Sequence, residues 1–128
     1  MTSTTSEPVE IVDHYGSCHC GAVKWRFRGP TVLNALTCNC SICTKKNNVC
    51  YAVENPNDFE LLQGADNITT YEFNTKTAKH MFCKTCGVQS FYKQRVVPAR
   101  TAIVVYCIDG DTVKKVNVTE TFKGKDWV

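Results

Sequence analysis

The chain has 128 residues, of which 43% are hydrophobic and 21% are charged, and its formal net charge is +3. This size suits one domain with a single core, and the mild positive charge favours small anionic ligands over tight nucleic-acid binding. It contains no apolar run of the roughly 20 residues that a membrane-spanning helix needs. The first thirteen residues are polar and acidic, unlike a secretory signal, so we expect an intracellular protein of the cytoplasm or nucleus.

The pattern of apolar residues along the chain predicts a mainly β fold of short strands. After a flexible tail over residues 1–12, residues 13–128 form the expected domain, which opens with a turn-rich segment at 14–21. Val23, Trp25 and Phe27 then alternate with basic residues, a period of two that is typical of a half-buried strand. The predicted strands are 22–28, 31–37, 49–53, 59–63, 68–73, 88–93, 101–107 and 113–118, and residues 41–46 are a candidate helical turn.

The segment Cys38-Asn39-Cys40-Ser41-Ile42-Cys43 places three thiols within six residues. The reducing interior of a cell disfavours structural disulfides, and an odd total of nine cysteines cannot all be paired. The clustered thiols therefore indicate a metal site. Soft thiolate ligands select zinc, copper(I) or iron-sulfur clusters, and zinc is the default without a ferredoxin spacing.

A second group of cysteines predicts a structural zinc site. Cys83 and Cys86, followed by Gly87, have the spacing of a zinc knuckle, which supplies two ligands. Cys18 and Cys20 supply the other two from the far end of the domain. A site built from these four thiolates joins segments more than sixty residues apart, so metal binding contributes directly to folding.

With those four assigned, Cys38, Cys40 and Cys43 give their zinc three ligands and leave one position open for water or substrate. A fourth ligand, such as Cys50, Cys107 or a histidine, remains an alternative that would close the site. Cys50 and Cys107 otherwise have the character of small buried residues on strands. His19 and His80 are expected to pack beside ligands or to orient them.

A zinc ion with three thiolates is a poor Lewis acid, so binding an incoming thiol as thiolate is favoured over activating water. Lys45 and Lys46 stand where positive charge offsets the excess negative charge of such a site. A redox sensor, in which the three thiols form disulfides and release the metal, is a third possibility beside an enzyme and a zinc-stabilised interaction module.

The order of these seven cysteines resembles that of the glutathione-dependent formaldehyde-activating enzymes over residues 14–127. The phrases Ile68-Thr69-Thr70-Tyr71 and Phe82-Cys83-Lys84 and the segment from Cys86 to Tyr92 are similar to the centromere protein V branch of that family. The resemblance implies a β-tent fold of short antiparallel strands stabilised by two zinc ions per chain. Cys18, Cys20, Cys83 and Cys86 would hold the structural zinc, and Cys38, Cys40 and Cys43 the substrate-side zinc.

The same resemblance implies a carbon-sulfur lyase that joins formaldehyde to glutathione, its cosubstrate, as S-hydroxymethylglutathione, or reverses that step. Cations around the open site would hold the glutathione carboxylates, and Lys45, Lys46 and Arg95 are the candidates. A non-catalytic interaction module of the centromere protein V type, with protein partners, is the alternative. No membrane partner is expected.

Overall fold

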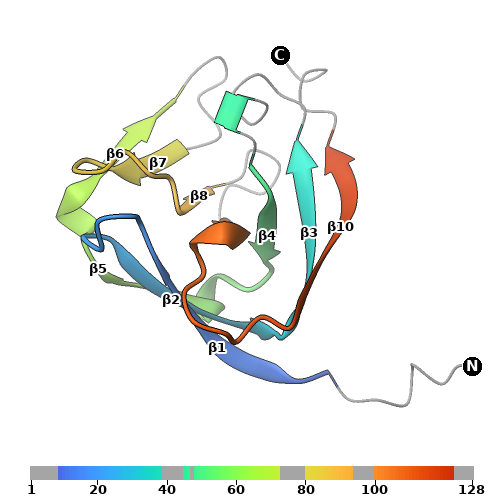
Figure 1. The fold of residues 1–128 in the computed structure, drawn as a ribbon. Helices are drawn as coiled ribbons and strands as arrows, with labels where there is room; N and C mark the ends of the chain where they lie inside the picture. The colour runs from blue at the N-terminus through green and yellow to red at the C-terminus, as the bar shows by residue number, and fades with distance from the viewer. Residues whose placement is uncertain (1–8, 39–44, 47, 73–79, 94–99, 123–128) are drawn as a thin grey trace, which may run out of the picture.

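The computed structural model describes residues 9–38, 45–46, 48–72, 80–93 and 100–122. Within these residues the fold is mainly β, as predicted, with ten strands in three sheets (Figure 1). The strands are β1 (Ile11–Ser17), β2 (Lys24–Pro30), β3 (Val32–Cys38), β4 (Cys50–Val53), β5 (Phe59–Gln63), β6 (Ile68–Tyr71), β7 (His80–Cys83), β8 (Phe91–Lys93), β9 (Thr101–Val104) and β10 (Lys115–Phe122).

Strands β1, β2 and β5 form an antiparallel sheet in that order. On β2 the predicted alternation is confirmed, because Trp25 and Phe27 are fully buried while Lys24 and Arg28 are exposed. The expectation of a turn-rich segment at 14–21 is wrong for its first half, since β1 extends to Ser17. The residues that β1 turns inward include His14 and Gly16, which do not produce an apolar alternation.

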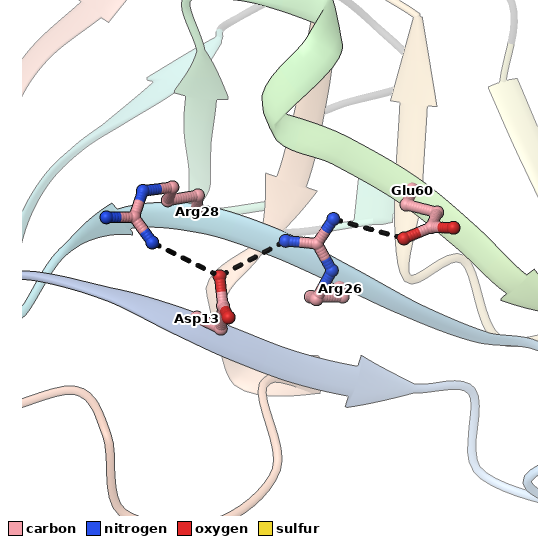
Figure 2. Close-up of polar contacts among 4 residues, drawn as sticks. All are labelled: Asp13, Arg26, Arg28 and Glu60. Atoms are coloured by element: carbon pink, nitrogen blue, oxygen red, sulfur yellow. Dashed lines mark hydrogen bonds and ion pairs between the residues drawn. The ribbon is translucent and has the colours of Figure 1, made fainter.

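The solvent side of this sheet carries a chain of ion pairs (Figure 2). Asp13 on β1 lies between two arginines of β2, 3.1 Å from Arg26 and 3.8 Å from Arg28. Arg26 also contacts Glu60 on β5, with 3.0 Å between Nη2 and Oε1. The pairs therefore follow all three strands of the sheet, although exposed pairs of this kind contribute only about 0–1 kcal/mol each.

The second sheet has five strands in the order β10-β3-β4-β9-β8. Strands β3 and β10 run parallel and side by side, with both arrowheads at the same end in Figure 1, whereas the other pairings are antiparallel. The core lies between this sheet and the first one. Its fully buried side chains include Trp25, Phe27, Leu33 and Ile103.

Strands β6 and β7 form a separate two-stranded antiparallel sheet. The strand predicted at 59–63 is observed with the same bounds, and most of the other predicted strands are observed shifted or shortened by a few residues. The predicted strand at 101–107 ends at Val104, because the chain then turns through a 3-10 helix, η4 (Val105–Cys107). Similarly, the strand expected at 88–93 begins only at Phe91, after the turn that follows Cys86.

Helical structure in the described residues is short. Residues 45–46 are helical, and the predicted turn over 41–44 lies outside the described residues. Two further 3-10 helices, η2 (Pro56–Asp58) and η3 (Ala65–Asn67), flank β5. None of the helices in the described parts of the chain has the length and apolar character to cross a membrane.

Candidate metal centre

Two turns from distant parts of the chain bring four cysteines together. Cys18 and Cys20 lie on the turn between β1 and β2, and Cys83 ends β7 with Cys86 on the turn that follows. Each turn contains a glycine with positive φ directly after its second cysteine, Gly21 at 83° and Gly87 at 78°. This left-handed conformation costs glycine little, and it lets both turns curl tightly around their sulfurs.

The four sulfur atoms lie within 4.8 Å of one another. Cys18 Sγ and Cys20 Sγ are 3.7 Å apart, and Cys20 Sγ and Cys83 Sγ are 3.6 Å apart. A tetrahedral zinc ion with bonds of about 2.3 Å separates its sulfur ligands by about 3.8 Å. The donor set and its spacing therefore fit one zinc ion held by the four residues that the sequence paired.

Backbone amides point at these sulfurs, as they do around thiolates. The amides of Thr85 and Cys86 donate to Cys83 Sγ at 3.3 and 3.5 Å, and the amide of Val23 donates to Cys18 Sγ at 3.3 Å. The hydrogen bonds from Cys86 and Thr85 hold the pKa of Cys83 at about 6, despite opposing desolvation. Cys83 is thus prepared to bind a metal as thiolate at neutral pH.

The pKa values of Cys86 and Cys20 are shifted in opposite directions. The Val88 amide is the largest influence on Cys86 and lowers its pKa. At Cys20 the Ala22 amide lowers the pKa, but desolvation and the neighbouring thiols outweigh it and raise the pKa to about 11. Without a metal, the four thiols would not all lose their protons at neutral pH. Such a cluster is expected at a metal site, because a coordinating cation deprotonates the thiols that bind it.

Asn67, at the end of η3, is a residue of the centre that the sequence did not reveal. Its side-chain amide donates to Cys83 Sγ at 3.3 Å and to Thr85 Oγ1 at 3.1 Å, and its backbone carbonyl accepts from the backbone amide of Lys84 at 2.8 Å. It therefore orients the knuckle from a segment sixteen positions earlier in the chain. No local spacing marks such a residue.

The predicted second site falls largely outside the described residues. Strand β3 ends at Cys38, of which the backbone is described but not the side chain. Cys40, Cys43 and Arg95 lie outside the described residues. Lys45 is exposed, and Lys46 is half-buried with its Nζ 5.7 Å from the centroid of the Phe82 ring. The three-cysteine site and its cations therefore remain predictions.

None of the other described cysteines and histidines is among the four clustered sulfurs, although Cys107, whose pKa burial raises, lies close enough to Cys18 and Cys86 for their charges to raise it further. Cys50 is buried, with its Sγ 3.2 Å from the Tyr92 hydroxyl, and the His80 ring stacks on Tyr92 with centroids 5.4 Å apart. Cys107 Sγ lies 3.9 Å from the Gln89 carbonyl, and burial raises its pKa to about 11. His19 is exposed.

Known proteins match both the sequence and the fold. A curated Halomonas elongata protein named "Putative glutathione-dependent formaldehyde-activating enzyme" is 35% identical over 79 residues, 56% of this chain and 50% of that relative, so the match spans half the relative's length. The crystal structure of a Rhodobacter sphaeroides protein from structural genomics is 33% identical with a TM-score of 0.68, over 82% of this chain and 99% of the other. The family model described as glutathione-dependent formaldehyde-activating enzyme matches residues 13–124, and this chain therefore belongs to that family.

Proposed function

We propose that the protein is a zinc-dependent carbon-sulfur lyase that joins formaldehyde to glutathione, or separates them, with two zinc ions per chain. The observation that carries the proposal is the convergence of Cys18, Cys20, Cys83 and Cys86, whose sulfurs lie within 4.8 Å of one another and would supply the four ligands of one zinc ion. Cys38, Cys40 and Cys43 are left to a second site with an open position. Membership of the family supports glutathione as the thiol.

The reaction needs a thiolate and a place for one proton. A zinc ion held by Cys38, Cys40 and Cys43 would lower the pKa of a bound thiol, so that the substrate sulfur is ionised at neutral pH. The sulfur lone pair then forms the bond to the formaldehyde carbon. The carbonyl π electrons pass to oxygen, which takes up the proton that the thiol released, and the product is S-hydroxymethylglutathione.

Residues of this chain support that chemistry by charge and by anchoring. Lys45 and Lys46 bring two positive charges close to the cysteine segment in sequence, and Lys46 is held near Phe82, one residue before Cys83. Strand β3 delivers Cys38 at its end and is fixed on both edges, by β10 and β4. The first ligand is thus carried by a paired strand, which limits its movement.

The test is a zinc count on the purified protein together with product formation. We expect two zinc ions per chain, and one in Cys40→Ser, which should stay folded and lose formation of S-hydroxymethylglutathione as followed by NMR. Cys107→Ser is the matched control and should keep both ions and the activity. One zinc in the unmodified protein, or a second zinc fully enclosed by protein ligands, would contradict the proposal and favour an interaction module.

A further inference from the structure

A cleft of about 370 Å³ lies against the turn that carries Cys18 and Cys20, and we call it the Cys20 cleft. Its described walls are the end of β1, the start of β2, Leu62 of β5 and Asp109. Cys83 and Cys86 are not among the described residues that line it. The four-sulfur cluster therefore meets this cleft on the side of Cys18 and Cys20.

The protein holds the four sulfurs with unequal firmness. Cys18 and Cys83 are 3% and 2% exposed, Cys86 is half-buried, and Cys20 is exposed. Cys83 Sγ accepts N–H groups of three residues, and Cys18 Sγ accepts the amide of Val23. Withdrawing either buried sulfur from a metal would break these bonds inside the protein. The Cys20 side chain can instead turn into the cleft and water, so an incoming donor atom displaces it most easily.

Charged side chains stand beside the exposed sulfur. A Cβ added at Gly21 would lie 3.9 Å from Lys24 Cε, so the exposed Lys24 side chain extends over the turn directly after Cys20. Asp109 also lines the cleft, where it accepts from Ser17 Oγ at 2.6 Å. A zinc ion with four thiolates has a net negative charge that repels anionic ligands, and Lys24 opposes that repulsion at the point of entry.

We infer that zinc enters and leaves the four-sulfur cluster through the Cys20 cleft, and that Cys20 is the first ligand exchanged for an incoming anionic donor. The inference rests on the proposed function for the zinc at this cluster. In the exchange, a lone pair of the incoming thiolate or carboxylate forms a bond to zinc while the bond to Cys20 Sγ breaks. The electron pair of the broken bond stays on Cys20 Sγ, which takes up a proton from water. Lys24 favours anionic acceptors over neutral ones.

The first experiment measures the rate of zinc transfer to excess chelator at low salt. Cys40→Ser is the starting protein, because it is expected to keep this zinc alone, so that the rate reports the four-sulfur cluster. With EDTA, an anionic chelator, we expect Lys24→Glu to slow the transfer by about 5- to 20-fold, because it changes the local charge by two units. With TPEN, a neutral chelator, the same substitution should change the rate by less than about twofold.

Lys115→Glu is the matched control for Lys24→Glu. Lys115 is an exposed lysine on β10 that pairs with Val32, beyond the end of β2 opposite to Lys24, and its reversal should leave both rates unchanged. Asp109→Asn tests the opposite direction. It keeps a side chain to which Ser17 can donate but removes a negative charge, so it should speed the transfer to EDTA by about 2- to 5-fold.

Limited alkylation of the unmodified, zinc-loaded protein with N-ethylmaleimide is a second measurement that needs no variant. Peptide mapping should find Cys20 modified at least about tenfold faster than the other three clustered cysteines, because thiolate reactivity follows exposure. Faster modification of any other of the four would overturn the inference. A transfer rate that does not depend on the EDTA concentration, or equal slowing in Lys24→Glu and Lys115→Glu, would overturn it as well.

These results are separable from those that test the proposed function. Transfer to EDTA that depends on Lys24, in a protein that forms no S-hydroxymethylglutathione, would refute the lyase alone. Formation of that product with two zinc ions per chain, together with transfer rates unaffected by Lys24→Glu, would refute the entry route alone.

Discussion

At the scale of single residues, the proposed metal centre depends on side chains that would not bind the metal. Asn67 donates to Cys83 Sγ, and we expect Asn67→Ala to weaken zinc retention by about 10- to 100-fold, the usual cost of losing a residue that orients a ligand. Asn67→Asp should weaken it more, because a carboxylate would then face a thiolate. Competition with a chromophoric chelator measures both variants.

Asn117→Ala is the control for that comparison. Asn117 lies on β10, across the molecule from β7 (Figure 1), and its side-chain amide donates to Asn34 Oδ1 at 3.4 Å. Its removal should leave zinc retention unchanged. If Asn67→Ala and Asn117→Ala release zinc at the same rate, the side chain of Asn67 has no part in holding the knuckle, and its backbone contact with Lys84 is sufficient.

His14 lies in the segment 14–21, which the sequence led us to expect as turn-rich, but the structure places it on a strand. It is fully buried on β1, its Nε2 donates to the Pro30 carbonyl at 2.8 Å, and its Nδ1 lies 2.6 Å from the Thr112 hydroxyl. The next inward residue on this strand, Gly16, is not apolar, so the sequence shows no alternating pattern there. Its partners are sixteen and ninety-eight positions away, so no local pattern contains them.

At the scale of elements, β1 is fixed against β2 by a close approach at Gly16. A Cβ added there would lie 2.2 Å from Trp25 Cη2 and 2.6 Å from the Cys107 carbonyl oxygen. Both neighbours are held, since Trp25 is fully buried with its Nε1 donating to Ser90 Oγ. We expect Gly16→Ala to lower the free energy of unfolding by about 3 kcal/mol, as overpacked cores do. Urea denaturation measures it.

Gly110→Ala provides the comparison for Gly16→Ala. No atom lies within 4 Å of a Cβ at Gly110, and the only penalty there is a φ of 77°. That backbone strain costs a non-glycine residue about 1–2 kcal/mol. Equal losses in the two variants would mean that β1 moves away from Trp25 without resistance, contrary to the packing.

Strand prediction succeeded where burial follows the period of two and failed where it does not. On β2, Trp25 and Phe27 face the core between charged residues, so the strand is visible in the sequence. The parallel pairing of β3 with β10 joins positions more than eighty apart, such as Val32 with Lys115. Local patterns carry no information on such a pair, because its stability depends on long-range contacts.

The four-sulfur centre was predictable for a different reason. Two-residue and three-residue cysteine spacings restrict where their sulfurs can meet, and tetrahedral coordination then requires two such pairs. The structure brings the sulfurs of Cys18, Cys20, Cys83 and Cys86 within 4.8 Å of one another.

At the scale of the whole molecule, the four-cysteine cluster ties the two-stranded β6-β7 sheet to the rest of the fold. Cys83 at the end of β7 meets Cys18 and Cys20 between β1 and β2, across sixty-three positions from Cys20. An isolated two-stranded sheet is at best marginally stable in water, so β6 and β7 depend on this link together with the packing of Ile68 and Met81 against the core. Strands β4 and β9, in contrast, lie inside a five-stranded sheet.

Removal of the metal should therefore open the molecule unevenly. On addition of a strong chelator we expect amide protection to fall by at least about 100-fold in β6 and β7, while β4 and β9 keep most of theirs, because local opening follows the weakest-held unit. Hydrogen exchange followed by mass spectrometry distinguishes the segments. Cys20→Ser, which removes one ligand without a chelator, should give the same pattern. Uniform loss of protection would instead mean that the centre holds the whole fold, and unchanged protection that the four cysteines hold no metal.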